Sequence, residues 1–310
     1  MKKVLLIAGG GTLGYYTASE LLRLGHCVDI ICPEDKVSDN SQLRYFKALG
    51  THEFLTELFA REKYDGIVNF IHYKQVDEYK KIHSLLIKNT SHLIFLSSYR
   101  VYAGCECPIR EDSPRIYDTT DNAKFFTEED YANPKSQAED FLVNECSGEP
   151  WTIVRPVISF SMHRFDIFTY SGTSVLDNDI LCMPESARAH HAGIDWAGNS
   201  GKLIANVLFN QKAYGECYTV SSAQNLTWGE VAQLYTELAG TEFKWIEKEE
   251  WLRHEEYIQN SYWAAVYDRF YDRKIENRKV LEATGLKKED FKSIKEGLKI
   301  EIAKAKLLEA

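Results

Sequence analysis

The chain has 310 residues, of which 44% are hydrophobic and 27% charged, a composition typical of a folded globular protein that excludes global disorder. At ~150 residues per domain, this length allows one large domain or two modest ones. Acidic residues outnumber basic ones by 46 to 37, and the net charge of -9 argues against a protein that grips nucleic acid over its whole surface.

The seven cysteines and the apolar runs narrow the class further. Their number is odd and their spacing fits neither a disulfide framework nor a zinc site, so we expect reduced cysteines and no metal. No run reaches the ~20 apolar residues of a membrane span. The short run Val4–Ala8 is followed at once by glycines, which is not typical of a signal peptide. We therefore expect a cytoplasmic protein with no membrane contact.

The first 160 residues alternate short apolar runs with helical patterns. The strands that we expect are, in chain order, Val4–Ala8, Val28–Cys32, Ile67–Ile71, His92–Ser97 and Thr152–Arg155. The helices that we expect between them are Tyr15–Leu24, Tyr79–Ile87 and one that starts near Pro134 and includes Glu139–Asn144. Strands separated by helices predict an α/β fold, a doubly wound parallel sheet of the Rossmann type with helices on both faces.

The pattern changes after Pro156. A loop-rich stretch comes first, then a helix over Asp195–Leu208 and a strand over Glu216–Val220, and from Leu226 the chain is mainly helical and rich in aromatic residues. We predict a dinucleotide-binding domain of residues 1–165, which 193–222 rejoins. Residues 166–192 and 223–310 would form a smaller, mainly helical substrate-binding domain.

Gly9, Gly11 and Gly14 form a G-x-G-x-x-G motif between the first strand and the first helix. In this context glycine lets the backbone approach a pyrophosphate, and the helix N-terminus supplies free N–H groups. The motif therefore predicts dinucleotide binding.

The end of the second strand bears on the choice between NAD and NADP. An acidic residue there would bind the ribose hydroxyls, but Cys32 occupies the position, Asp29 lies inside the strand, and Glu34 and Asp35 follow. These nearby acids and a lack of close basic residues favour NAD without excluding NADP.

Tyr131 and Lys135 form a Y-x-x-x-K pattern that places both side chains on one face of a helix. A lysine ammonium beside a phenol lowers the phenol's pKa and makes tyrosine a usable general base. Ser98 follows a strand, at the carboxyl end of the sheet, where its hydroxyl could orient a substrate alcohol towards Tyr131.

These motifs resemble the extended short-chain dehydrogenase/reductase superfamily, the NAD-dependent epimerase/dehydratase group. Several departures from the family pattern resemble its atypical subgroup related to chloroplast stem-loop RNA-binding proteins. The resemblance rests on IAGGGTLG, FLSSYRVY, YANPKSQAED, VRP, IDWA and the closing DRKIENRKVLEATGL, in the family's order. It implies that Tyr131 transfers a proton, Lys135 holds the nicotinamide ribose, and Ser98 hydrogen-bonds the reacting oxygen. It also implies cofactor contacts from a set of turn and strand-end residues, namely Gly9, Gly11, Thr12, Leu13, Gly14 and Cys32.

Two departures from the family pattern matter. Ala8 stands where the family has its first glycine, which weakens cofactor binding without excluding it. Tyr99 and Arg100 stand where the family's sugar 4,6-dehydratases carry an Asp-Glu pair, so that reaction is not expected.

The substrate contacts that we expect come from four arginines, Arg100, Arg155, Arg164 and Arg188, which could hold anionic groups. For Arg155 a structural role is equally open. Aromatic residues among 245–271, including Trp245, Trp251, Tyr257 and Phe270, could stack on RNA bases, but near-neutral charge there favours packing.

The sequence thus predicts an NAD(P)-dependent epimerase or oxidoreductase acting on a nucleotide-sugar or related polyol, with a Ser-Tyr-Lys set. The alternative is a non-catalytic protein that binds a dinucleotide or RNA. By family analogy a homodimer is possible.

Overall fold

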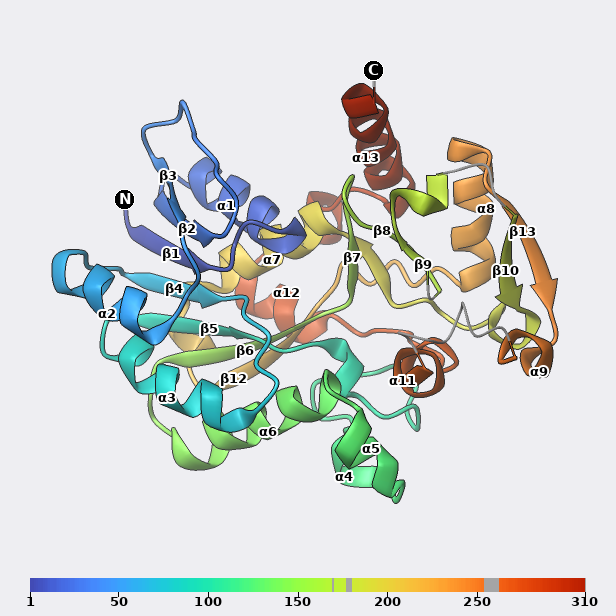
Figure 1. Ribbon diagram of the computed structural model, residues 1–310, viewed down its shortest axis with the longest axis horizontal. Coiled ribbons are helices and arrows are strands. Elements are labelled where there is room, and N and C mark those ends of the chain that lie inside the picture. Colours follow the sequence, from blue (N-terminus) through green and yellow to red (C-terminus); the bar gives the residue numbers. More distant parts are fainter. Residues whose placement is uncertain (169, 177–179, 254–261, 310) are drawn as a thin grey trace.

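The computed structural model describes residues 1–168, 170–176, 180–253 and 262–309. Its centre is a seven-stranded sheet in which every strand pair is parallel, in the order β3-β2-β1-β4-β5-β6-β12 (Figure 1). The strands are β1 (Lys3–Ile7), β2 (Cys27–Cys32), β3 (Leu43–Lys47), β4 (Gly66–Asn69), β5 (His92–Leu96), β6 (Trp151–Pro156) and β12 (Glu216–Val220). The predicted doubly wound α/β fold is confirmed.

Helices cover both faces of this sheet (Figure 1). One face carries α1 (Thr12–Arg23), α7 (Ala197–Val207) and α12 (Arg278–Thr284), and the other α2 (His52–Arg61), α3 (Val76–Ile87) and α6 (Ala132–Glu145). Burial from both sides explains why the strands are continuous apolar runs, as in Val4–Ile7, where every side chain is fully buried.

A second group of elements lies beside the carboxyl ends of the strands, with its own apolar core. Its strands are β7 (Ile158–Phe160), β8 (Phe165–Ile167), β9 (Tyr170–Gly172), β10 (Ile180–Pro184), β11 (Ile194–Trp196) and β13 (Glu242–Ile246). Its helices include α8 (Trp228–Ala239), α9 (Lys248–Trp251), α11 (Tyr262–Ala264) and α13 (Ile294–Glu309). Two short helices, α4 (Ile116–Thr119) and α5 (Ala123–Glu128), precede α6.

Three of the differences from the predicted elements and domains lie in the second half of the chain. The predicted helix over Asp195–Leu208 begins later, at Ala197, because residues 194–196 form β11 and pair with β7. The C-terminal part contains β13, which pairs with β10, so it is less purely helical than predicted. α12, which the predicted division places in the second domain, packs on α7 and β12 of the first. The division itself stays a prediction.

Candidate active site

Ser98 lies just past the carboxyl end of β5, in the turn that leads into the short helix η1 (Tyr99–Val101). Its hydroxyl accepts a hydrogen bond from the backbone N–H of Arg100 at 3.2 Å, which holds the turn. The side chain is almost fully buried and lines a cavity of about 540 Å³. Ligands bind at this edge of the sheet in doubly wound folds.

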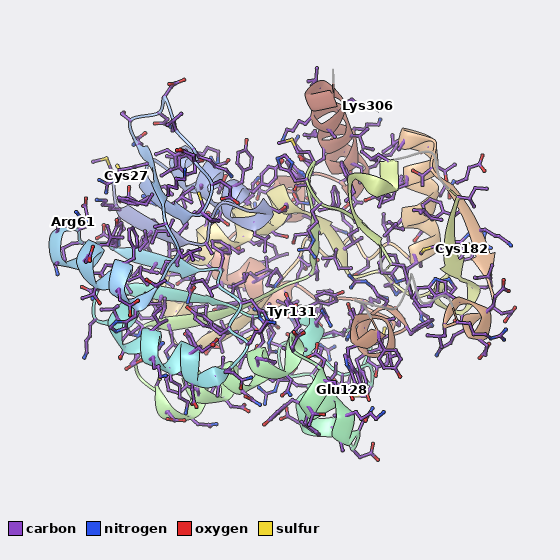
Figure 2. The ribbon with its side chains drawn as sticks, in the orientation of Figure 1. Cys27, Arg61, Glu128, Tyr131, Cys182 and Lys306 are labelled. Carbon is purple, nitrogen blue, oxygen red and sulfur yellow. The ribbon has the colours of Figure 1, made fainter. Side chains whose placement is uncertain are left out.

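Tyr131 and Lys135 lie at the start of α6, where Tyr131 lines the same cavity and Lys135 is buried behind it. Tyr131 is the N-cap residue, and the Lys135 Nζ lies 5.3 Å from the centre of its ring. Lys135 also donates a hydrogen bond to the Leu96 carbonyl at 2.7 Å, and the Ser98 hydroxyl lies close enough to the Tyr131 phenol to lower its pKa. Figure 2 shows Tyr131 near the centre of the molecule, between the sheet and the second group of elements. The structure therefore brings the three predicted residues together.

Two cations next to Tyr131 set its protonation. Burial raises the pKa of the phenol, but Lys135, Arg100 and the Ser98 hydroxyl outweigh burial and hold that pKa below its usual value. The Arg100 guanidinium carbon lies 4.6 Å from the ring centre. Burial in turn lowers the pKa of Lys135. The phenol is thus placed to serve as a base closer to neutral pH than free tyrosine.

Glu129 fixes the start of α6, a role that was not predicted from the sequence. Its buried carboxylate accepts the backbone N–H groups of Tyr131 at 3.1 Å and Asn133 at 2.8 Å. It also pairs with Arg100 at 3.2 Å. The available signal was an acidic residue just before the helix, a position that favours the helix dipole.

His72 covers the other side of Tyr131. The two ring centres are 5.1 Å apart, and the His72 Nε2 bonds the Asp130 carbonyl at 2.9 Å. Burial, with Lys135 nearby, lowers the His72 pKa, so the ring is neutral at neutral pH. A neutral ring of this kind packs against Tyr131 without opposing Lys135.

The turn of Gly9–Gly14 leaves open space at the N-terminus of α1. A Cβ on Gly14 would lie 2.2 Å from the Gly9 carbonyl oxygen, so only glycine lets α1 pack this closely on the turn. A Cβ on Gly11 would meet no atom within 4 Å, and Gly11 caps the helix without a side-chain hydrogen bond. Open space beside uncapped N–H groups suits a phosphate anion.

A second cavity, of about 590 Å³, lies on the other side of the turn. Its wall is largely apolar and includes Ile31, Cys32, Leu49 and Ile71. Ala8 stands in the walls of both cavities. The glycine turn is therefore flanked by a polar cavity at Tyr131 and an apolar one at the end of β2.

The end of β2 corrects one expectation about basic residues. Cys32 is buried, and burial raises its pKa. Lys36 donates a hydrogen bond to the Gly10 carbonyl at 2.9 Å, so a basic residue does lie beside the turn. Glu34 lies there too, with an oxygen 2.8 Å from where a Cβ of Gly10 would stand. Asp29 lies inside the strand and pairs with Arg44 at 2.6 Å.

Of the four predicted arginines, the structure brings two to the cavity. Arg100 and Arg164 line it, and both lower the pKa of Tyr131. Arg155 lies outside it and forms a buried two-bond pair with Glu139 at 2.6 and 2.8 Å, which gives it the structural role. Arg188 is exposed and also lies outside, against the Trp245 ring at 5.1 Å. The sequence alone could not tell which of these arginines line the cavity, because each arginine's position depends on contacts with residues distant in the chain.

A buried hydrogen-bond network, not predicted from the sequence, connects the η1 turn to the second group of elements. The Tyr99 hydroxyl donates to Asp268 at 2.7 Å, and Asp268 also pairs with Arg269 and with Arg273 at 2.9 Å. Arg269 donates to the Tyr99 hydroxyl at 2.8 Å and lines the cavity. The repeated Asp-Arg pairs among aromatic residues were the available signal.

The aromatic residues proposed for RNA stacking divide between core and surface. Trp251 and Phe270 are buried in the core of the second group, which removes them from any base-stacking surface. Trp245 is half-buried, and Tyr257 lies outside the described residues.

The described residues contain one group with metal-ligand spacing, formed by His83, Cys146 and Glu149, whose ligand atoms lie within 4.8 Å of one another. His83 and Glu149 already form a hydrogen bond at 2.7 Å, and all three lie away from the cavity, by α3 and the end of α6. The absence of a metal stays a prediction. Among the described helices, none combines the length and apolar character that a membrane crossing requires.

Known proteins match this chain by structure. No family model matches it, and no curated protein matches it in sequence. A short-chain dehydrogenase/reductase superfamily protein from Agrobacterium tumefaciens with bound NAD aligns with TM-score 0.69 and 13% identity, over 99% of this chain and 98% of that one. UDP-glucose 4-epimerase from Thermotoga maritima, solved with UDP-glucose, aligns at 0.66 and 13%, over 97% of each chain. MoeE5 in complex with UDP-glucuronic acid and NAD aligns at 0.67 and 14%, over 97% of this chain and 98% of that one.

These matches cover nearly the whole chain, including the second group of elements. At such low sequence identities they show the fold and nothing more specific. Over nearly its whole length the chain therefore has the same fold as these solved short-chain dehydrogenase/reductase and epimerase structures.

Proposed function

We propose that this protein is an NAD(P)-dependent epimerase or oxidoreductase that acts on a nucleotide-sugar or a related polyol. The observation that carries the proposal is that Ser98 and Tyr131 line one cavity with the open glycine turn, while the buried Lys135 lies directly beside the Tyr131 ring. The solved structures with bound NAD and UDP-sugars support it at the level of the fold.

The residues around the turn fit a dinucleotide. Gly11, Thr12 and Leu13 would hold the pyrophosphate through their backbone N–H groups at the N-terminus of α1. The apolar cavity beside Cys32 would take the adenine end, and the cavity at Tyr131 the nicotinamide end. When bound, the nicotinamide supplies hydride transfer.

The protein's own part is to hold the substrate oxygen and move its proton. Ser98 would hydrogen-bond the reacting oxygen, and the Tyr131 phenolate would accept the hydroxyl proton. Lys135 and Arg100 stabilise the phenolate by charge. No Asp or Glu lines this cavity among the described residues, which supports our expectation that a carboxylate-driven 4,6-dehydration is not its reaction.

The test is cofactor capture followed by a single substitution. Protein purified and then denatured would release any retained nucleotide for mass spectrometry, and the apoprotein would be titrated with NAD(H) and NADP(H). In Tyr131→Phe we expect turnover to fall ~10²–10⁴-fold, the usual contribution of general acid–base catalysis, with cofactor affinity nearly unchanged.

Tyr262→Phe is the matched control, because it removes the same hydroxyl from a side chain that is 48% exposed. Retained NAD would favour an epimerase that recycles its hydride, and exchangeable binding would favour an oxidoreductase. If neither dinucleotide binds, the proposal fails and the non-catalytic alternative takes its place.

A further inference from the structure

The cavity at Tyr131 is lined by basic side chains and by no carboxylate among the described residues, in a protein whose net charge is -9. Arg100, Arg164, Arg269 and His163 line it, and no acidic residue does among the described part of the chain. A cavity of this kind attracts anions and raises their local concentration. The pyrophosphate of a bound dinucleotide would lie at the turn of Gly11–Gly14. It would therefore not explain why basic side chains also gather beside Tyr131.

Arg100 stands at the reacting end of the cavity. Its guanidinium carbon lies 4.6 Å from the Tyr131 ring centre, and its backbone N–H bonds the Ser98 hydroxyl at 3.2 Å. A substrate oxygen held by Ser98 and Tyr131 therefore brings the neighbouring carbon's substituents within reach of this guanidinium.

The contacts of Arg100 hold its side chain in place and leave most of its N–H donors available for a ligand. Its side chain is 19% exposed and makes one hydrogen bond to Glu129, at 3.2 Å, out of the five N–H donors of a guanidinium. Glu129 also receives the backbone N–H groups of Tyr131 and Asn133, so its negative charge is shared with the start of α6. Arg100 thus keeps donors and positive charge for a ligand.

A cation in this place has two opposite effects on the oxidation of a neutral sugar: it stabilises the Tyr131 phenolate, and it opposes the loss of hydride from the substrate carbon. Positive charge develops on the carbon that loses hydride, and a nearby guanidinium opposes it by Coulomb repulsion. An anionic substituent next to that carbon would cancel the opposition. A planar carboxylate is the group that matches the guanidinium fork in geometry.

We propose that the substrate carries a carboxylate beside the carbon that is oxidised, as in a uronic acid, and that Arg100 binds this carboxylate. This inference rests on the proposed function and narrows it to acidic sugars or polyols. Arg100 is then a residue that determines specificity, next to the one that transfers the proton.

The test compares matched acidic and neutral probes on NAD-loaded Tyr131→Phe protein, in which binding is measured without turnover. The probes are UDP-glucuronate against UDP-glucose, and gluconate against glucitol. Calorimetry should show the acid bound at least about tenfold more tightly in one pair or both, because hydrogen bonds between charged groups are strong. In Arg100→Met that preference should vanish while affinity for the neutral probe stays within about threefold.

Two further variants keep the test decisive if Arg100→Met folds poorly around the unpaired Glu129. Arg100→Lys keeps the charge and should retain part of the preference, and Arg100→Met with Glu129→Gln removes both charges. Arg278→Met is the control, since its side chain is 72% exposed. Equal affinity for acid and neutral probes, or no binding of either acid, would overturn the inference. NAD binding in the same samples separates this failure from that of the proposed function.

Discussion

The candidate site has two ends, one at Tyr131 and one at the glycine turn, and the Tyr131 end matches the family's sequence pattern more closely. At the Tyr131 end, the three predicted residues lie together, with Ser98 and Tyr131 at the edge of one cavity and Lys135 beside the Tyr131 ring. At the glycine-turn end, Ala8 adopts φ 56° where the resemblance expects glycine, and Cys32 occupies the position of an acid. Proton transfer needs particular side chains, whereas phosphates bind to backbone N–H groups that most side chains leave in place. The second end therefore tolerates more change.

The largest expected effect comes from Lys135→Met. Without this buried cation the pKa of Tyr131 should rise. Because Tyr131 must be deprotonated to act as a base, the ascending limb of the pH–rate profile should move to higher pH. Turnover at pH 7 should fall by about 10²-fold or more, in line with the loss of a general base.

The profile of steady-state rate against pH measures this change. Lys299→Met, which removes an exposed lysine of α13, should leave both the rate and the limb in place. If the ascending limb does not move in Lys135→Met, Lys135 does not set the pKa of Tyr131. The Tyr131 end of the site would then depend on its particular side chains no more than the glycine-turn end does.

A smaller effect tests whether Glu34 replaces the missing acid at the end of β2. It lies at the glycine turn, with Lys36 close by. If its carboxylate binds the ribose hydroxyls, Glu34→Gln should weaken NAD binding about tenfold, as expected for a hydrogen bond to a charged group. Lys36→Met should leave NAD affinity nearly unchanged. Fluorescence titration with NADH and NADPH measures both, and a loss of NADPH binding in Lys36→Met would point to NADP instead.

The sheet could be predicted because its strands are short apolar runs buried from both sides, as in Val4–Ile7. Edge strand β3 was not among the predicted strands, since its residues LRYFK alternate and are only half-buried. The reacting side chains could be predicted because Ser98 follows a strand, and Tyr131 and Lys135 are one helical turn apart.

What surrounds those side chains could not be predicted. Tyr99 and Asp268 are 169 positions apart, and their hydrogen bond exists only once the second group of elements packs on the sheet. Arg155 and Arg100 carry the same side chain, yet Glu139 holds one in the core while the other lines the cavity. Such assignments depend on long-range partners that no local pattern indicates.

The smallest expected effect separates backbone strain from cofactor binding at Ala8. A left-handed alanine costs ~1 kcal/mol relative to glycine, so Ala8→Gly should raise the free energy of unfolding by about that amount. Ala223, at φ 54°, has the same strain and lines neither cavity, so Ala223→Gly should stabilise the protein equally. Only Ala8→Gly should also change NAD affinity, upwards and by a few-fold, because Ala8 stands in both cavity walls. Urea unfolding and NAD titration of the two variants measure this. If Ala8→Gly and Ala223→Gly bind NAD with equal affinity, Ala8 does not hinder the cofactor. The departure from the family pattern at the glycine turn would then have no effect on cofactor binding.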